Sequence, residues 1–457
     1  MNLKKRLTAV LCILAMLGAV IFGAMQTDRI EDVIPENVLP ARPTIRLWYT
    51  DEAIGEYLSS VAFAYQEAND VRVLPVLTSG LEYLEAVNDA SVEGQDFPDL
   101  FVVSNDSLEK AYLAGLAQEV DPEGSLLNPG NFPQAALDAV TYQGKKTAFP
   151  LYYETSALVY NQTYLAQAAA EMETDAKSLV PRTIEDILSF ADSYNAPETV
   201  EAVFKWDVSD IFYNYFFAGN YISVGGPCGD EETQIDIYNE EAVIGLKAYQ
   251  DLNQFFSIDA ETSSYEAVVQ DFLDGKLIFT VATTDILGRI AETSAAGAFP
   301  YEYGTVPLPD VNGQVKAKGL SVTYALAVNG YGAQKELAVD FARFLVEQES
   351  QKMYERTGKL PARKQAVSDV PGADGFVEEY ADSMPMPKLM STANFWVWME
   401  VAYTKIWQGE NVSDILKALS EQIMTQVTGS EYVEETYIEV PTVEETTVEE
   451  IQTEAMD

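Results

Sequence analysis

The fold of this chain is decided by FPDLFVVSNDSLEKAYLAGLAQEVD (residues 97–121) together with YQGKKTAFPLYYETSALVYN (residues 142–161). The first segment predicts a buried strand at residues 100–103, a polar loop and a helix. The second predicts a turn at Gly144 and two strand-like runs at residues 147–153 and 157–160. Between these runs stands YYET, with two aromatic rings, a carboxylate and a hydroxyl. We interpret YYET as the floor of a ligand cleft, where the chain passes from one lobe to another.

The same order of strand, polar loop and helix occurs three times in the first part of the chain. The strands are expected at residues 45–49, 71–77 and 100–103. This repetition is typical of a parallel α/β sheet. Ligands of such sheets collect at the carboxyl ends of the strands, where Asp51, Ser79 and Asp106 stand in this sequence.

Composition excludes several classes of function. The chain has 457 residues, and its 28 basic and 72 acidic residues give a net charge of −44. A field of this sign repels nucleic acid and anionic lipid, so neither is expected as a partner. Histidine is absent, and of the two cysteines Cys12 lies in an apolar leader, which leaves Cys228 without a sensible partner. We therefore expect no metal, no cofactor and no histidine-dependent catalytic centre.

The two ends of the chain differ from its body. Residues 1–25 carry a basic start and a long apolar run, which fits either a cleaved signal peptide or an uncleaved membrane anchor. Residues 26–42 read as a spacer. Residues 429–457 form a low-complexity acidic tail that we expect to be disordered, with a role as a lure for cations or a partner as the alternative. In each case the body lies outside the cytoplasmic membrane.

The second part of the chain repeats the pattern of buried strands and amphipathic helices. A strand at residues 277–281 ends in a polar loop at 283–285, and Asn312-Gly313 predicts a type I′ hairpin turn. A long helix is expected over residues 334–356. Two more helices are expected on either side of a break at Gln408-Gly409.

Five colinear segments resemble one known family. They are FPDLFVVSND with AYLAGLAQEVD, YQGKKTAFPLYYETSALVYNQTYL, DFLDGKLIFTVATTDILG, YGTVPLPDVNGQ, and KELAVDFARFLVEQESQKMYERTGKLPAR. Over residues 43–425 the chain is similar to the extracellular solute-binding proteins of ABC importers, in the sugar-binding group that includes maltose-binding protein. No single residue is diagnostic; the order of the segments carries the resemblance.

The resemblance implies an α/β fold of the two-lobed periplasmic-binding-protein type (type II), in which each lobe is a mainly parallel sheet flanked by helices and the ligand cleft lies between the lobes. The N-terminal lobe is expected at residues 43–153 plus 323–358. The C-terminal lobe is expected at residues 154–322 plus 359–428. Crossovers between the lobes are expected near residues 152–157, 319–322 and 359–362.

The resemblance also implies positions for the ligand. The candidates are Thr50, Asp51, Ser79, Asn105, Asp106, Tyr153, Glu154, Asp210, Phe212, Thr284, Asp285 and Trp396. Sugars offer C–H faces to aromatic rings and hydroxyls to carboxylates, so these residue types fit a sugar. Other roles stay open: Asp51 is also suited to cap the first helix, and Phe212 to the core. Trp396 and Trp398 point to different faces of a helix, and family position favours Trp396 for the ligand.

The predicted function is extracytoplasmic capture of a sugar or oligosaccharide by closure of the cleft, followed by delivery to an ABC permease. We expect a monomer, and no enzyme. One alternative is a surface sensor or adhesin that keeps the fold but has no transport role. A less favoured alternative is a secreted carbohydrate-active enzyme, since paired carboxylates hydrolyse glycosides without histidine.

Overall fold

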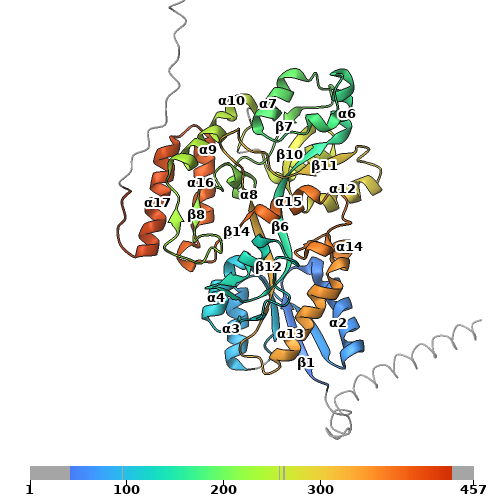
Figure 1. Cartoon of the computed structure of the whole chain (residues 1–457), viewed down its shortest axis with the longest axis vertical. Helices are drawn as coiled ribbons and strands as arrows, with labels where there is room; N and C mark the ends of the chain where they lie inside the picture. Colours follow the sequence, from blue (N-terminus) through green and yellow to red (C-terminus); the bar gives the residue numbers. More distant parts are fainter. Residues whose placement is uncertain (1–41, 95, 257, 261–262, 435–457) are drawn as a thin grey trace, which may run out of the picture.

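The computed structural model describes residues 42–94, 96–256, 258–260 and 263–434. The expected leader, nearly all of the spacer and most of the acidic tail lie outside these residues. Figure 1 shows the described part as two lobes, one at each end of the long axis, joined by strands that run through the middle. Within the described part, no helix has both the length and the apolar composition needed to span a membrane.

The N-terminal lobe is built on three parallel strands. These are β1 (Thr44–Tyr49), β2 (Arg72–Leu77) and β3 (Leu100–Ser104), in the order β2-β1-β3. Helix α2 (Gly55–Asn69) follows β1 and buries residues at helical spacing, among them Leu58, Val61 and Tyr65. The strands and helices expected from the sequence of this region are confirmed.

The longest strand is β6 (Phe149–Asn161), and it belongs to both lobes. Residues 149–155 pair with β12 (Leu320–Val328), whereas residues 156–160 pair with β10 (Leu277–Thr283). The sequence predicted two strand-like runs separated by YYET, and this was wrong: YYET lies inside one unbroken strand. β6 therefore carries the chain between lobes without a loop.

Strand directions follow from this passage. In the N-terminal lobe β12 is antiparallel to both β3 and β6, so it is the one reversed strand beside β1, β2, β3 and β6. In the C-terminal lobe β6 is the reversed strand, antiparallel to β10 and to β11 (Tyr303–Val306). β7 (Ala202–Phe204) is parallel to β10. Each lobe thus has a mainly parallel sheet in which a long crossover strand, β12 or β6, runs opposite to these neighbours.

Helices cover both sheets (Figure 1). Those of the N-terminal lobe are α3 (Tyr83–Glu93), α4 (Leu108–Leu113), α5 (Gln134–Ala139), α13 (Lys335–Phe344), which continues as a π-helical turn at Leu345–Glu349, and α14 (Met353–Thr357). Those of the C-terminal lobe are α6 (Gln162–Glu171), α7 (Ile184–Ser193), α8 (Ile211–Asn214), α9 (Glu240–Asp251), α10 (Asn253–Phe256), α11 (Tyr265–Leu273), α12 (Ile286–Ala295), α16 (Phe395–Trp407) and α17 (Val412–Thr428). Helix α15 (Asp374–Asp382) packs against β6, β11 and α5, between the lobes.

Short elements complete the fold. They are the hairpins β4 (Thr141–Tyr142) with β5 (Lys145–Lys146) and β8 (Ser223–Val224) with β9 (Ile235–Asp236), strands β13 (Leu360–Pro361) and β14 (Met384–Pro385), and 3₁₀ turns at Glu52–Ile54, Asn105–Ser107, Ala176–Leu179, Tyr215–Phe217, Ser350–Lys352, Lys364–Ala366 and Met390–Thr392. One apolar cluster continues through both lobes along β6, from Ile45 of β1 to Phe272 of α11.

A segment that we call the strap, residues 384–392, touches both lobes. On the N-terminal side, the Asn105 amide donates to the Met386 carbonyl (2.6 Å), and Glu109 accepts from the Met390 N–H. On the C-terminal side, the backbone N–H of Lys388 donates to the Gly229 carbonyl (2.7 Å). The strap begins with two residues that pair with β12, and it adds a further contact between the lobes.

The start of the acidic tail is placed against the C-terminal lobe. The chain reverses at Gly429, which has a positive φ of 66°, and residues 430–434 run back beside α17. The N–H of Glu434 donates to Glu421 (3.1 Å), and Lys417 donates to the Glu434 carbonyl (3.0 Å). The expected disorder does not hold for these first tail residues, and the rest of the tail lies outside the described residues.

Candidate functional site

The site is organised by the two faces of β6. Successive side chains of a strand point to opposite faces, so Tyr152, Glu154 and Ser156 share one face and Tyr153 and Thr155 share the other. The contacts agree: the Tyr153 ring stacks on Tyr380 of α15, with ring centroids 3.6 Å apart. We call the face of Tyr152, Glu154 and Ser156 the cleft face.

The first cluster on the cleft face consists of Asp51, Tyr152, Glu154, Tyr324 and Lys359. The Lys359 ammonium lies 2.9 Å from Glu154 and 3.3 Å from Asp51. The Tyr152 hydroxyl donates to Asp51 Oδ2 (3.3 Å), the same oxygen that pairs with Lys359, and the Tyr152 ring stacks on Tyr324 at 4.6 Å between centroids. The side chains of Asp51 and Glu154 stay 28% and 31% exposed, so both carboxylates keep room for a ligand.

The second cluster consists of Ser156, Tyr213, Tyr265, Thr283 and Asp285. The Tyr213 and Tyr265 rings stack at 4.8 Å between centroids. The Tyr265 hydroxyl donates to Asp285 Oδ1 (2.6 Å), and the Thr283 hydroxyl donates to the same oxygen (2.5 Å). The Asp285 side chain is 48% exposed. Thr283 is the direct strand partner of Ser156, so this cluster borders β6 from the C-terminal lobe.

The two clusters share one arrangement on opposite sides of the passage. Each has a stacked pair of tyrosines whose hydroxyl donates to a partly exposed aspartate. Glu154 of the first cluster and Ser156 of the second are neighbours on one face of β6, because residues two apart on a strand lie about 7 Å from each other. The arrangement offers carboxylate acceptors and aromatic surface from both lobes to one small molecule, which is how compact polar ligands are held.

Burial keeps the site's tyrosines protonated. The pKa of Tyr324 is raised by burial, and further by the nearby charges of Glu154, Asp106 and Asp51. Burial and then the Asp285 charge raise the pKa of Tyr265 in the same way. For Lys359, burial lowers the pKa, but the Glu154 and Asp51 carboxylates outweigh it and the net pKa is raised. At neutral pH the tyrosines are therefore hydroxyl donors and the lysine is a cation.

Several residues expected from the sequence meet at this site. Asp51, Glu154 and Asp285 belong to the clusters described above. Asp51 also fulfils its alternative role, since Oδ1 accepts from the Ala53 N–H (2.9 Å) and caps the first helical turn. Asp106 lies close enough to Tyr324 to raise its pKa, and its Oδ1 is buried with no hydrogen-bond partner among the described residues.

Thr50 and Ser79 lie at the rim beside the first cluster. Both are exposed at the ends of their strands. The Ser79 hydroxyl accepts from the Leu81 N–H (3.2 Å), and a Cβ on Gly80 would approach Thr50 within 3.9 Å. The structure therefore brings these two loops together, as expected for neighbouring parallel strands.

Three expected site residues are buried away from the cleft face. Tyr153 is 1% exposed and stacks on Tyr380, as described above. Asn105 is fully buried, and its carbonyl oxygen accepts from the Thr323 N–H (2.9 Å) while its amide holds the strap. Thr284 is 3% exposed. These positions correct the sequence-based candidates, because each side chain is committed to packing or to internal hydrogen bonds.

Of the remaining candidates, Asp210 and Phe212 lie beside the second cluster, and Trp396 packs on Tyr215 and Phe395. Asp210 caps α8 by accepting from the Phe212 N–H (2.7 Å), and its pKa is raised mainly by burial. Phe212 is half-buried, and its carbonyl accepts from the Ser156 hydroxyl (2.5 Å). Trp396 is half-buried, with Tyr215 at 6.4 Å between ring centroids. Asp210 also lines a hollow of about 530 Å³ with Asp207 and Glu400.

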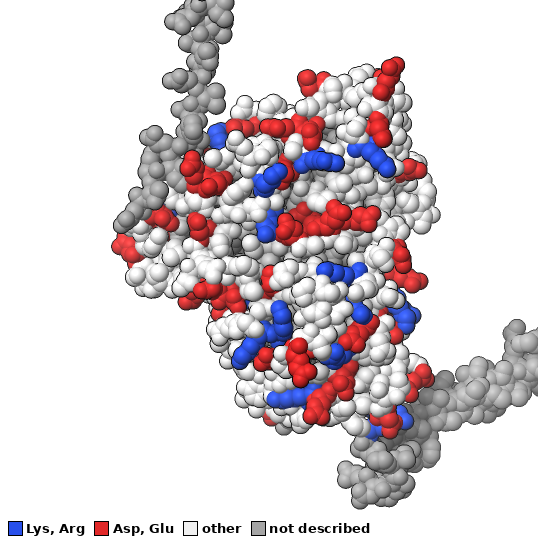
Figure 2. Space-filling view, in the orientation of Figure 1, with Lys and Arg blue, Asp and Glu red and all other residues white. Residues whose placement is uncertain are grey.

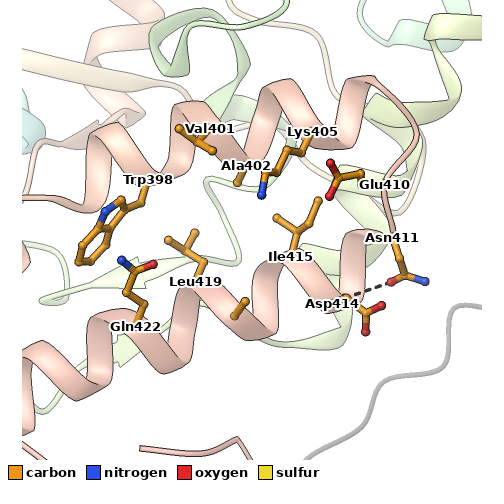
Figure 3. Close-up of a pocket in the computed structure, with 11 residues that line it drawn as sticks. Trp398, Val401, Ala402, Lys405, Glu410, Asn411, Asp414, Ile415, Leu419 and Gln422 are labelled. Carbon is orange, nitrogen blue, oxygen red and sulfur yellow. Dashed lines mark hydrogen bonds between the residues drawn. The ribbon is translucent and has the colours of Figure 1, made fainter. Parts of the chain in front are cut away.

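A separate groove of about 480 Å³ lies between α16 and α17 (Figure 3). Trp398 lies at one end, Glu410 and Asn411 at the other, and Lys405 lies between them. Both walls come from the C-terminal lobe, and no crossover strand contributes. We therefore do not place the ligand in this groove.

The structure adds seven residues to the two clusters that the sequence-based candidates omit: Tyr152, Ser156, Tyr213, Tyr265, Thr283, Tyr324 and Lys359. A signal for Tyr152 was present. Strand alternation puts Tyr152 on the same face as Glu154. Once Glu154 was a candidate ligand contact, Tyr152 should have been a candidate too, and Tyr153 should not. Tyr265, Tyr324 and Lys359 reach the site from distant segments, and nothing in their local sequence marks them.

Acidic side chains are spread over both lobes, with basic ones among them (Figure 2). Within the described residues, no group of three or more acidic or cysteine side chains is arranged to hold a metal ion.

Two α/β lobes that share crossover strands, with a polar and aromatic site on the shared strand, define a class of two-lobed binding proteins. The chain belongs to the bacterial extracellular solute-binding protein family, whose profile matches residues 61–382. It is also similar to two curated relatives that are named as binding proteins. The maltodextrin-binding protein of Bacillus subtilis (strain 168) is 22% identical over 366 residues, which cover 77% of this chain and 82% of the relative. The maltotriose-binding protein of Pyrococcus abyssi is 22% identical over 351 residues, with 73% and 71% covered.

Solved structures confirm the fold. An extracellular solute-binding protein from Staphylococcus aureus in complex with maltose superposes with a TM-score of 0.72 at 20% identity, covering 85% of this chain and 99% of that one. A cyclo/maltodextrin-binding protein complexed with maltotetraose gives a TM-score of 0.70 at 22% identity, covering 85% and 98%. The predicted two-lobed α/β fold is therefore confirmed.

Proposed function

We propose that this protein captures a short α-glucan, such as maltotriose, outside the cell and delivers it to the membrane subunits of an ABC importer. The observation that carries the proposal is the matched pair of clusters, one from each lobe, on the cleft face of β6. Relatives that are named for binding maltodextrin and maltotriose support the same ligand class. The proposal assigns binding and no catalysis.

In this proposal Asp51, Asp106, Glu154 and Asp285 accept hydrogen bonds from sugar hydroxyls. The faces of Tyr324 and Tyr265 contact the C–H surface of the sugar. Thr50, Ser79 and Trp396 line the rim. Because the acceptors come from both lobes, the ligand favours the closed state, in which both clusters contact it.

The first test is a thermal-shift screen of the chain without residues 1–25. The ligands are maltose, maltotriose, maltotetraose, a set of amino acids, short peptides and spermidine. A ligand that binds only the folded state raises its stability, so we expect maltodextrins to raise the midpoint by several degrees and the other classes to leave it unchanged. If the midpoint stays unchanged with every sugar, the proposal is overturned and the sensor or adhesin alternative is favoured.

Site variants sharpen the test. Glu154→Gln and Asp285→Asn each remove one carboxylate from one lobe, and a hydrogen bond to a charged acceptor is worth about 1.5–3 kcal/mol. We expect each variant to weaken maltotriose binding at least about tenfold by calorimetry. The matched control is Glu85→Gln, which removes a surface carboxylate that pairs with Lys110 on the outside of the N-terminal lobe. Wild-type affinity in either site variant would contradict the assignment.

Closure is tested by small-angle scattering. Saturating maltotriose should reduce the radius of gyration of the wild type, because the lobes close on the ligand. Equal dimensions with and without ligand would argue against closure. We further propose that residues 1–25 hold or release the protein at the outer face of the membrane.

A further inference from the structure

The floor of the cleft holds more carboxylates than cations. Asp51, Glu154 and Asp106 all lie near enough to Tyr324 to raise its pKa. Among the described residues, Lys359 is the cation that pairs with Asp51 and Glu154, at 3.3 and 2.9 Å. One oxygen of Asp106 is buried without a hydrogen-bond partner among these residues. The charge state of Lys359 therefore decides how negative the floor is.

Lys359 is held in place by its backbone. It follows Gly358, whose positive φ of 70° ends α14, and its N–H donates to the Thr357 hydroxyl (3.0 Å). The next two residues form β13, which pairs with Tyr153 and Tyr152 of β6. The ammonium is also 5.5 Å from the centre of the Tyr152 ring. A side chain anchored at the crossover in this way keeps its charge between the two carboxylates.

The pairing leaves part of each carboxylate free for a ligand. A carboxylate has about four acceptor positions. Lys359 uses one on Glu154, and on Asp51 three are used, by Lys359, the Tyr152 hydroxyl and the Ala53 N–H. A neutral hydroxyl can use a remaining position without moving the lysine. A ligand ammonium in the same place would repel Lys359 at close range, and the partly buried site screens that repulsion poorly.

We propose that Lys359 sets the charge preference of the cleft by weakening the binding of amino sugars relative to uncharged sugars of the same shape. This inference rests on the proposed function and assigns its selectivity to one residue. Without Lys359, Asp51, Glu154 and Asp106 would stand together without a cation, and the floor would favour a positively charged ligand.

The experiment measures two ligands on each variant by calorimetry in low salt. The ligands are maltotriose and an analogue in which one primary hydroxyl is replaced by an amino group. The variants are wild type, Lys359→Met, Lys359→Arg and the control Lys247→Met, which removes a lysine paired with Asp251 on α9. The readout is the ratio of the two dissociation constants, so a general loss of affinity cancels.

In the wild type, we expect Lys359 to keep the affinity for the amino analogue below the level that the carboxylates alone would give. Lys359→Met should shift the ratio toward the amino analogue by at least about tenfold, since one partly buried charge has been removed. Lys359→Arg, which keeps the charge, and Lys247→Met should keep the wild-type ratio. Raised salt should shrink the difference between Lys359→Met and wild type.

A different outcome overturns the inference. An unchanged ratio in Lys359→Met, with equal losses for both ligands, would show that Lys359 does not select by charge. Thermal unfolding of Lys359→Met confirms that the variant is folded. If wild type binds maltotriose and only the ratio fails to move, the inference fails alone. If wild type binds no maltodextrin, the proposed function fails with it.

Discussion

Two lysines connect distant segments near the passage between the lobes, but one is paired with carboxylates and the other is buried against backbone carbonyls. Lys359 is 24% exposed at its side chain and faces the carboxylates of Asp51 and Glu154. Lys388 of the strap is 1% exposed, and its ammonium donates to the backbone carbonyls of Asp138 (2.9 Å) and Cys228. The net pKa of Lys359 is raised by its carboxylates, whereas burial lowers the pKa of Lys388 to about 8.

The difference teaches what a charge does in each place. At the cleft, ion pairs offset the free-energy cost of partial burial. Lys359 therefore stays charged with little loss of stability, and its ammonium is exposed to a ligand. In the strap, carbonyl dipoles only partly replace lost water, so the charged form of Lys388 is held at a cost in stability. In our proposal the first lysine serves selectivity, whereas the second donates to backbone carbonyls of both lobes.

The largest expected effect is the pH dependence of stability caused by Lys388. Its folded pKa of about 8 lies below the ordinary 10.5, so between these pH values the unfolded chain binds more protons and wild-type stability rises with pH. The rise is at most about 3 kcal/mol, since one pKa unit corresponds to about 1.4 kcal/mol. Lys388→Met should lack this rise. The measurement is urea unfolding of both proteins from pH 7.5 to 10.5.

The charged groups around Lys388 belong to several segments: Asp138 on α5, Cys228 and Asp230 on the loop before β9, and Lys146 on β5. Lys247→Met serves as the control, because its lysine is paired on the surface of α9. Parallel curves for Lys388→Met and wild type would show that the Lys388 ammonium is adequately solvated in the folded state.

A buried charge of the opposite sign tests whether burial governs the effect. Glu379 of α15 accepts from the N–H groups of Leu308 (2.9 Å) and Gly319 (2.8 Å), yet burial raises its pKa to about 7. The folded state therefore binds more protons between pH 4.5 and 7, and wild-type stability falls as pH rises through this window, by up to about 3 kcal/mol. Glu379→Gln should lack this fall in the same unfolding measurement. An equal fall in both proteins would exclude Glu379 as its source.

The strap contact itself is tested at Gly229. This glycine has a positive φ of 65°, and a Cβ there would approach the Pro387 Cα within 2.6 Å. Gly229→Ala should lower the free energy of unfolding by about 2–3 kcal/mol, from backbone strain plus the clash. The matched control is Gly94→Ala, where φ is 71° and nothing lies within 4 Å of the new Cβ, so that only about 1–2 kcal/mol is lost. Equal losses of unfolding free energy in the two variants would show that the strap can move aside without a cost in stability.

The smallest expected effect on stability is that of Lys359→Met. Its ion pairs are partly exposed, and pairs of this kind contribute about 0–1 kcal/mol. Because its folded pKa is raised, the contribution is present below pH 10.5 and is lost as pH rises through the folded pKa, opposite in sign to Lys388. Chemical denaturation at pH 7 checks the size. A loss of unfolding free energy above about 2 kcal/mol would show that Lys359 has a structural role, as Lys388 does.

Two sequence-based predictions were wrong because other contacts outweighed the local sequence preference. Asn312-Gly313 predicted a type I′ turn, which needs positive φ at both residues, but neither has one. The Asn312 side chain instead accepts from the N–H groups of Gln314 and Val315 (both 2.8 Å). Likewise, the polar residues of YYET do not interrupt β6, because β12 and β10 pair with it on both sides of the passage. Tertiary pairing decided both segments.

The sequence by itself determined the repeated strand and helix order, the resemblance to two-lobed solute-binding proteins, and the carboxylates Asp51, Glu154 and Asp285. The strand and helix order follows from apolar periodicity, which is a local property. The resemblance rests on the order of five segments, and it implied the three carboxylates as ligand candidates. The sequence also determined that β6 has two faces. Only the tertiary structure decided which face is the cleft, because Tyr380, more than two hundred residues later, covers Tyr153 and leaves Tyr152 and Glu154 beside Lys359. A strand's sequence gives its alternation, but the segments packed against it choose the side that meets the ligand.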